Sequence, residues 1–252
     1  TVRAGGQFLC GQMPTKSGDA PKELWRHELL AEFQAESPQW GVACSPLIEG
    51  DLVIVQPGGE AGSVAAFDKL SGVLKWKAGT NPSGYSSPVA ATLAGRRVIL
   101  AMTGNALLAL ELDGSLLSEY PWKTEYKGNI ATPIVVDDYV FISSAYSHGC
   151  ALLRGLSDGG SFRLEQVFFR KNVMRNHHAT SVYKDGHLYG FDGEDRMKCV
   201  NLRTLREAWD SREPKKGSLI LADKWLIVLS ENGDLSLMEA TPEEPRVLAK
   251  LP

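Results

Sequence analysis

The sequence has no apolar run long enough to cross a membrane and no marked excess of one charge. Its longest apolar stretches, residues 98–102 and 106–110, are far below the ~20 residues that a bilayer-spanning helix needs. Its 27 Lys and Arg residues nearly balance its 30 Asp and Glu residues, for a formal net charge of -3. Without a global basic field, nucleic acid and anionic membrane surfaces are not expected partners.

Several signals of catalysis and targeting are also missing. The four cysteines are far apart and form no Cys-x-x-Cys pair, which argues against a zinc site. We expect them to be small buried residues of strands instead. They are Cys10, Cys44, Cys150 and Cys199. No Gly-x-Ser-x-Gly elbow is present, so a grouping of Ser86, His177 and Asp137 does not predict hydrolysis. The first residues show no signal peptide and no initiating Met, so the chain is expected to be processed or a fragment.

What the sequence does contain is an internal repeat. In each copy, a Ser or Thr start precedes an apolar run, a Gly/Asp turn, a second apolar run, a Gly and a third run. The copies begin at Ser45, Ser87, Thr132, Thr180 and Gly217. Spacings of about 42, 45, 48 and 37 residues fit the size of a four-stranded propeller blade.

The middle strands of the repeat are apolar throughout. Residues 52–55, 139–142 and 226–229 are continuous apolar runs of strand length, which predicts strands buried on both faces. A two-layer sandwich would leave one face of each sheet in water, whereas radially arranged sheets cover both. Pairs of Gly or Asp at 50–51, 137–138 and 185–186 predict tight hairpin turns.

Tryptophan marks the end of the fourth strand in several copies. A Trp at the edge of a blade can place its large apolar ring between adjacent sheets. We therefore expect these residues to serve packing first. They are Trp25, Trp76, Trp122 and Trp209.

The clearest copy resembles a known repeat family. Residues 64–76 read Val-Ala-Ala-Phe-Asp-Lys-Leu-Ser-Gly-Val-Leu-Lys-Trp. This run is similar to the repeat of quinoprotein alcohol dehydrogenases, of polyvinyl-alcohol dehydrogenases and of the propeller lipoprotein of the outer-membrane barrel-assembly machinery. Residues 190–209 are a looser version, and the resemblance covers about residues 40–252. It implies an all-β fold, a β-propeller of four-stranded antiparallel blades with about six blades.

Residues 1–252 are accordingly predicted to form a single β-propeller domain. Its blades are expected near residues 1–40 (incomplete), 41–82, 83–127, 128–174, 175–213 and 214–252. Residues 7–12 and 23–28 resemble the last strands of a blade whose first strand is absent. Two readings stay open: a ring of about six blades with an atypical first blade, or a fragment of a seven- or eight-bladed propeller.

The segments that lead into the first strands are candidates for a site, because in a propeller they lie at one mouth of the central channel. These lead-in segments, residues 39–42, 83–86, 126–129, 175–178 and 215–217, are rich in aromatic and basic residues. Concave aromatic walls with convergent donors predict a pocket for an anionic or polyhydroxylated ligand, or for an acidic peptide. The predicted ligand-binding residues are Trp40, Tyr85, Lys127, Asn129, Arg175, Asn176, His177 and Lys216.

No metal site is predicted there. Adjacent residues of an extended chain point to opposite sides, so at most one of His177 and His178 should face the channel. The acidic segments 192–195, which include Glu194, and 231–234 are interpreted as hairpin turns rather than metal ligands.

The resemblance leaves two functions open. Quinone-dependent relatives hold calcium and often carry adjacent cysteines against the cofactor, and this chain has no Cys-Cys pair. We therefore expect a non-catalytic scaffold that binds a protein or a small ligand at the basic and aromatic channel mouth. We expect it to have no catalytic residue, no metal and no cofactor. The alternative is a quinoprotein-like dehydrogenase with a redox cofactor at the channel mouth. A monomer in the periplasm, or otherwise outside the cytoplasm, is expected from the resemblance.

Overall fold

The structure is a computed structural model that describes residues 1–193 and 195–252. Its fold is built almost entirely from antiparallel strands. Its first sheet pairs β1 (Gln7–Gln12) with β2 (Lys22–Glu28), and the short helix α1 (Leu29–Glu32) follows. Within the described part of the chain, every later sheet has four strands in sequence order. No helix among the described residues is long and apolar enough to span a bilayer.

The five four-stranded sheets follow one another along the chain. The first two contain β3 (Leu47–Glu49), β4 (Leu52–Val55), β5 (Val64–Asp68) and β6 (Leu74–Ala78), then β7 (Val89–Leu93), β8 (Arg96–Met102), β9 (Ala106–Leu110) and β10 (Leu116–Pro121). The third contains β11 (Ile134–Val136), β12 (Tyr139–Ser144), β13 (Gly149–Asp158) and β14 (Ser161–Arg170). The last two contain β15 (Val182–Lys184), β16 (His187–Asp192), β17 (Arg196–Asn201) and β18 (Glu207–Ser211), then β19 (Gly217–Ala222), β20 (Trp225–Ser230), β21 (Leu235–Glu239) and β22 (Val247–Leu251).

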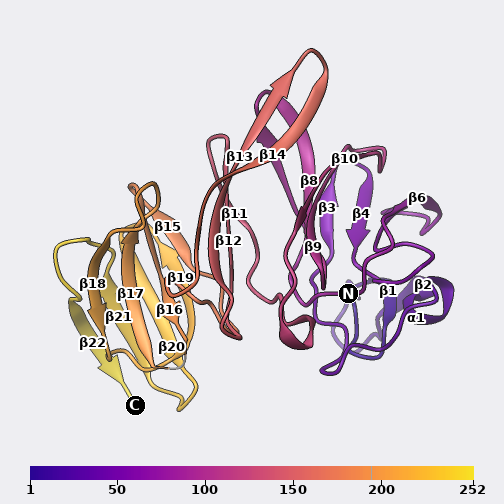
Figure 1. The fold of residues 1–252 in the computed structure, drawn as a ribbon. Coiled ribbons are helices and arrows are strands. Elements are labelled where there is room, and N and C mark those ends of the chain that lie inside the picture. The colour runs from indigo at the N-terminus through magenta and orange to yellow at the C-terminus, as the bar shows by residue number, and fades with distance from the viewer. Residues whose placement is uncertain (194) are drawn as a thin grey trace. The chain divides into compact units, whose positions relative to one another are not determined.

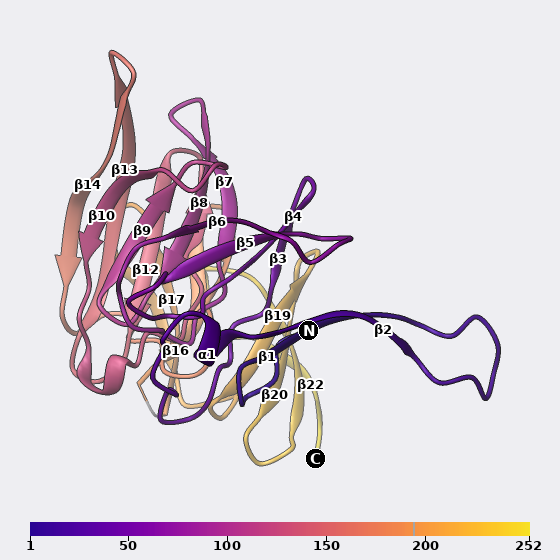
Figure 2. The same cartoon turned by 90° about the vertical axis from the view of Figure 1, so that its right-hand side faces the viewer.

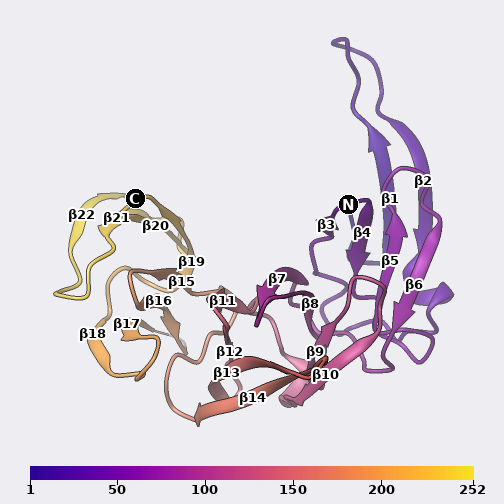
Figure 3. The same cartoon turned by 90° about the horizontal axis from the view of Figure 1, so that it is seen from above.

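The chain divides into two compact units. Unit 1 comprises Thr1–Asn129 and Leu156–Leu164, and unit 2 comprises Ile130–Gly155 and Glu165–Pro252. In unit 1, β1 and β2 run beside β5 and β6, and the turn between β1 and β2 projects away from the sheets (Figures 2 and 3). In unit 2, the sheet of β15 to β18 packs face to face against the sheet of β19 to β22 (Figure 1).

In unit 1 the middle strands are buried on both faces, as the apolar runs predict. Val53 and Val55 of β4 belong to a core shared with β1, whereas Ile54 between them belongs to a second core shared with β8 and β9. All three side chains are buried. The same alternation divides β5 between the two cores. Sheets stacked in this way, each covered by a neighbour on either face, are the architecture of a β-propeller.

Unit 2 repeats the arrangement with one exception. Val200 of β17 packs toward the sheet of β11 to β14, and its neighbour Cys199 packs toward the sheet of β19 to β22. The last sheet differs, since Leu226 and Val228 of β20 are buried while Leu229 is 51% exposed and Ile220 of β19 is 60% exposed. Within unit 2, therefore, only one face of this sheet is covered, by the sheet of β15 to β18, and burial of residues 226–229 on both faces stays a prediction.

Three of the four tryptophans join one sheet to the next. Trp25, Trp76 and Trp209 lie at matching positions of the last strand of their sheets, each directly after a bulge in the pairing. The Trp76 indole N–H donates to Leu112 O at 2.8 Å, in the turn between β9 and β10. The Trp209 indole N–H donates to Thr241 O at 2.8 Å, in the turn between β21 and β22. The prediction that these rings pack between sheets is confirmed.

Trp122 is a packing residue but not their counterpart. Trp76 lies opposite the third residue of β5, and the residue opposite the third residue of β9 is Glu119. Trp122 lies beyond the end of β10, where it is buried. The spacing explains the error, because Trp76 follows its turn glycine Gly72 by four positions and Trp122 follows Gly114 by eight.

The hairpin turns predicted from Gly and Asp pairs are also confirmed. Gly50, Asp137 and Asp185 all have positive φ, at 57°, 51° and 44°. Residues 231–234 form the turn between β20 and β21, closed by the bond from Gly233 N to Ser230 O. The other acidic segment, residues 192–195, includes Glu194, which lies outside the described residues.

The contact between Trp76 and Gly114 gives a first test. A methyl group at Gly114, where φ is +90°, would lie 2.7 Å from Trp76 Cδ2. We expect Gly114→Ala to lower the free energy of unfolding by about 2–4 kcal/mol, from the left-handed backbone and the overpacked ring together. Urea unfolding followed by circular dichroism measures the loss.

Gly95 supplies the matched control in the same sheet. Its φ is +77°, and nothing lies within 4 Å of an added methyl group. Gly95→Ala should therefore lower the free energy of unfolding by only about 1–2 kcal/mol, the backbone part alone. Equal losses in the two variants would show that the indole of Trp76 does not constrain the next sheet.

Candidate functional site

The eight residues that the sequence proposes for ligand binding fall in both units. Unit 1 holds Trp40, Tyr85, Lys127 and Asn129, and unit 2 holds Arg175, Asn176, His177 and Lys216. The convergence of all five lead-in segments on one channel mouth stays a prediction.

Unit 1 contains an open cleft of about 870 Å³ with aromatic and proline side chains in its wall. Tyr85 and Tyr126 line it together with Pro38 and Pro82. Trp40 packs against both tyrosines, with ring centroids 5.5 Å from Tyr85 and 6.2 Å from Tyr126. The rings are inclined to one another by 54° and 70°, so they form a ridged surface rather than a flat platform. We call this feature the aromatic cleft.

The loop that carries Tyr126 has an unusual backbone. Tyr126 and Lys127 are consecutive residues with φ of 58° and 55°, in the short 3₁₀ turn Glu125–Lys127. Left-handed conformations of this kind are strained for residues other than Gly, and they cluster at functional sites. A hydrogen bond to Glu125 raises the pKa of the Tyr126 hydroxyl. Tyr126 is 54% exposed, so the strained turn holds an aromatic ring at the surface.

The charges of the aromatic cleft are mixed and not basic. Glu36, Glu60 and Glu125 line it, against Lys123 and Lys127. Lys127 is paired with Glu36, with Nζ and Oε2 3.6 Å apart. The part of the predicted site in unit 1 therefore has the aromatic walls that the sequence indicates but carries a slight excess of acid.

Asn129 lies beneath the cleft and fixes its walls. Its buried amide donates to Thr103 O at 2.7 Å and to Trp122 O at 3.1 Å. Its side-chain oxygen accepts from Thr124 Oγ1 at 2.8 Å, and its backbone carbonyl accepts from Tyr85 N at 2.9 Å. Asn129 thus connects the loop of Tyr126 to the loop of Tyr85 from inside, where a ligand would not reach its amide.

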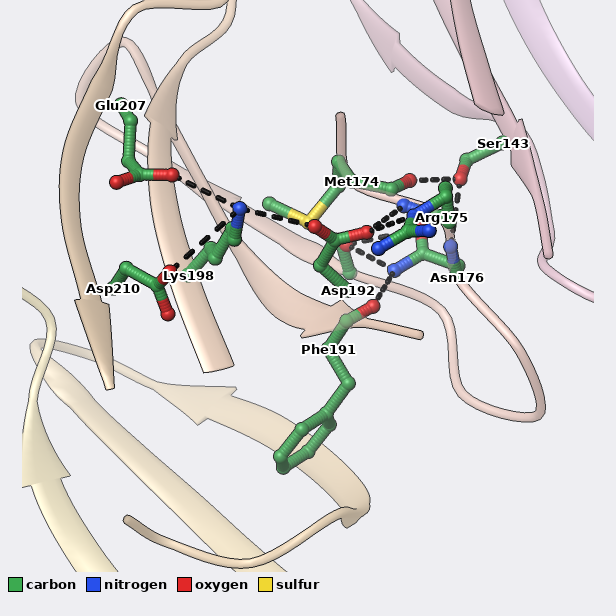
Figure 4. A network of polar contacts seen from close by, with 10 residues as sticks. Ser143, Met174, Arg175, Asn176, Phe191, Asp192, Lys198, Glu207 and Asp210 are labelled. Carbon is green, nitrogen blue, oxygen red and sulfur yellow. Dashed lines mark hydrogen bonds and ion pairs between the residues drawn. The ribbon is translucent and has the colours of Figure 1, made fainter. Parts of the chain in front are cut away.

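In unit 2, Arg175 belongs to an ion-pair network around a buried carboxylate (Figure 4). The Asp192 side chain is 2% exposed, and its Oδ1 accepts from Arg175 Nε at 2.7 Å and from Arg175 N at 2.9 Å. Its Oδ2 is 3.0 Å from Lys198 Nζ, which also lies 2.9 Å from Glu207. Burial acts to raise the pKa of Asp192, but the bonds from Arg175 and Lys198 outweigh it and the pKa is lowered.

Asn176 is an internal brace as well. Its buried amide donates to Ser181 Oγ at 2.9 Å and to Phe191 O at 3.0 Å. Its backbone N–H donates to Ser143 Oγ at 2.9 Å, and that hydroxyl donates to Met174 O (Figure 4). Asn176 therefore ties the lead-in segment to β12 and β16.

His177 sits between a lysine and a tyrosine. Lys216 Nζ is 3.0 Å from His177 Nδ1, and Tyr146 Oη is 3.2 Å from Nε2. An ammonium group can only donate, so Nδ1 accepts and Nε2 carries the ring proton in this arrangement. Glu231 Oε1 lies 3.5 Å from Lys216 Nζ. Lys216 thus has both an acceptor and an acid beside it.

The expectation that His177 and His178 point to opposite sides is wrong. Their rings are stacked, with centroids 3.7 Å apart. Residues 177–179 form a bend rather than an extended strand, so the alternation of a strand does not apply to them. Among the described residues, no group of three His, Cys, Asp or Glu side chains is placed to hold a metal ion.

Residues named for possible nucleophilic chemistry have other roles. Asp137 pairs with Arg203, with Oδ2 and Nη2 3.0 Å apart, and does not contact His177. Burial raises the pKa of Cys150 to about 12 and that of Cys199 to about 11. Thiols with such pKa values are protonated at neutral pH and unreactive. Cys44 is buried too, as predicted, whereas Cys10 is only partly buried.

Two residues that matter most to these clusters lie outside the eight. Tyr126 is in a lead-in segment and its ring was visible in the sequence, but its left-handed backbone had no Gly or Asn to signal it. Asp192 ends β16 and reads as part of a turn. Only knowledge of the fold, which brings the end of β16 beside Arg175, could have assigned it an ion pair.

The Asp192 network gives a second test. Because Asp192→Asn leaves Arg175 and Lys198 without their buried partner, we expect it to lower the free energy of unfolding at pH 7 by about 3 kcal/mol. The folded pKa of Asp192 is below the unfolded value of about 3.9. The contribution is therefore complete above that unfolded value and is lost as pH falls through the folded pKa. Urea unfolding of both proteins across this pH range measures the difference.

Asp137→Asn is the control, since Asp137 makes an exposed ion pair with Arg203 in a turn. Asn also tolerates the positive φ of that position. Its effect should stay below about 1 kcal/mol at every pH. A loss for Asp192→Asn as small as that of the control, or one that does not diminish in acid, would contradict the role assigned to Asp192.

Comparisons with known proteins agree with the fold. The family model described as outer membrane protein assembly factor BamB matches residues 17–209. A search of the curated proteins finds no match to this sequence. Among solved structures, BamB from Moraxella catarrhalis is 16% identical with a TM-score of 0.68, over 98% of this chain and 68% of that one. AztD from Citrobacter koseri is 13% identical with a TM-score of 0.56, over 99% and 68% of the two chains.

Quinoprotein enzymes share the fold as well. Quinohemoprotein alcohol dehydrogenase from Comamonas testosteroni is 12% identical with a TM-score of 0.57, over 84% of this chain and 43% of that one. At these identities the structural likeness speaks for the fold alone, whereas the family model spans most of the sequence. The chain is a β-propeller and belongs to the family of the outer membrane protein assembly factor BamB.

Proposed function

We propose that this chain is a non-catalytic, protein-binding propeller scaffold that serves the assembly of outer membrane proteins in the periplasm. The observation that carries the proposal is the family match over residues 17–209, to a family described as an assembly factor. The aromatic cleft of unit 1 is its docking site. Exposed aromatic side chains are enriched at protein interfaces because they bury a large area with few rotatable bonds.

The polar residues of the lead-in segments support this choice over a small-anion site. Arg175 is held by Asp192, Lys127 by Glu36, and Lys216 lies beside Glu231. An anion would have to compete with these carboxylates. The anionic or polyhydroxylated ligand expected from the sequence stays a prediction. We assign Arg175, Asn176, His177 and Lys216 the role of bracing loops in unit 2.

The donor set also fits a scaffold better than a quinone-dependent enzyme. The calcium that accompanies such a cofactor needs several oxygen ligands, usually carboxylates among them. Among the described residues, no group of three acidic, His or Cys side chains is placed to hold a metal ion, and the chain has no adjacent cysteines. We derive no step through such a cofactor. A bound chromophore in stoichiometric amount after addition of pyrroloquinoline quinone and calcium would reverse this assignment.

A binding measurement tests the scaffold function. The probe is a fluorescently labelled outer-membrane β-barrel polypeptide, unfolded in urea and diluted into buffer with the protein. We expect its anisotropy to rise on binding. We expect Trp40→Ala to weaken the affinity about tenfold, since the ring is 52% exposed and supports both tyrosines of the aromatic cleft.

Leu70→Ala is the control variant, because Leu70 is 77% exposed in a turn of unit 1 and does not line the aromatic cleft. Its affinity should equal that of the wild type. A labelled unfolded cytosolic protein controls for non-specific capture. Equal binding of both polypeptides, or equal losses in the two variants, would count against the proposal.

A further inference from the structure

The aromatic cleft has a shape that selects among polypeptide conformations. Its aromatic rings are inclined to one another, and two prolines stand beside them in the wall. A ridged surface of inclined aromatic rings accepts the compact rings of proline, and a polyproline II segment presents such rings in a preformed, low-entropy conformation. A β-strand would instead need an open sheet edge, and the cleft is lined by loops.

The charged residues around the aromatic cleft select among peptide ligands by the charge that the peptide carries. Of the three carboxylates in its wall, Glu36 is paired with Lys127, and Glu125 bonds to the Tyr126 hydroxyl. Glu60 lies in the same wall, is exposed, and has no ion pair among the described residues. A carboxylate next to a proline-binding aromatic surface favours a ligand with a cation beside its prolines.

The backbone of the cleft supports the same conclusion. Tyr126 and Lys127 stand side by side in the left-handed region, which holds the ring of Tyr126 at the rim. The loop is held from below by the buried amide of Asn129. A ring fixed before binding lowers the entropy that a ligand must overcome.

Building on the proposed scaffold function, we propose that the aromatic cleft binds an extended, proline-containing segment of the partner protein that carries an Arg or Lys beside its prolines. The prolines pack against the exposed rings of Tyr126 and Trp40. The cation lies toward Glu60. The small anion or acidic peptide expected from the sequence would be disfavoured here.

Isothermal titration with synthetic peptides tests the proposal. The reference probe is a Pro-x-x-Pro peptide with a flanking Arg, and its relatives replace the prolines by Ala, or the Arg by Ala or by Glu. We expect the reference peptide to bind, and each replacement to weaken it, with the Glu form weakest. A Val/Thr strand peptide and maltotriose serve as the alternative ligand classes.

Matched variants separate ring contact from loop disruption. Asn tolerates positive φ, so Tyr126→Asn removes the ring while suiting the backbone, and Lys127→Asn makes the same change one residue later. We expect Tyr126→Asn to weaken the reference peptide about tenfold. Lys127→Asn should raise its affinity, because loss of the lysine leaves the Glu36 carboxylate unpaired beside the cation of the peptide. Equal losses in both variants would overturn the proposal.

Glu60→Gln tests the proposed contact between the Glu60 carboxylate and the cation of the peptide. It should weaken the Arg peptide about two- to fivefold, the range of an exposed ion pair, and leave the Ala form unchanged. Preference for the Glu peptide, for the strand peptide or for maltotriose, or indifference to loss of the prolines, would refute the inference. If no peptide binds while the barrel polypeptide binds and is weakened by Trp40→Ala, the scaffold function stands and this inference fails. If neither probe binds, both fail.

Discussion

The structure depends on one packing constraint: a middle strand that lies between two neighbouring sheets buries both of its faces. In β4, Ile54 enters one core while Val53 and Val55 enter another. No polar side chain could occupy those positions without losing its hydrogen bonds to water. Function is therefore confined to the loops that connect the sheets, and the aromatic cleft is built from such loops. The sheets supply rigidity, and the loops supply chemistry.

The same constraint explains how much of the fold could be predicted from the sequence. A packing problem that recurs in every blade leaves a recurring sequence pattern, so strands, turns and the roles of Trp25, Trp76 and Trp209 could be predicted. The errors come where the pattern is broken once. Glu119 replaces the expected Trp in the second full blade, and its side chain accepts from Asn81 Nδ2 at 3.1 Å. Matching Trp122 to the other tryptophans by residue type alone hides this replacement. The number of residues between the turn glycine and the tryptophan would have revealed it.

The aromatic side chains of the cleft in unit 1 could be predicted from the sequence, but its charge and the contacts of its residues could not. The sequence places Trp40 and Tyr85 in separate lead-in segments, and their rings do meet. The sequence could not show that the side chains of Asn129 and Asn176 turn inward. An asparagine in a loop looks the same in the sequence whether its amide faces a ligand or a backbone carbonyl. The partners of Arg175 and His177 lie 17 and 39 residues away. Such pairs follow from the packing of strands and leave no local signal.

The distribution of strained and satisfied groups bears on why this propeller should bind rather than catalyse. The buried carboxylate of Asp192, whose pKa is lowered, is held by Arg175 and Lys198, so it is neither a free base nor a free ligand. Enzyme sites instead keep such perturbed groups in a cleft, with reactive atoms accessible. Here the strained backbone at Tyr126 presents an exposed aromatic ring at the cleft, beside the exposed ring of Trp40. That arrangement favours recognition of a chain segment over chemical transformation of a substrate.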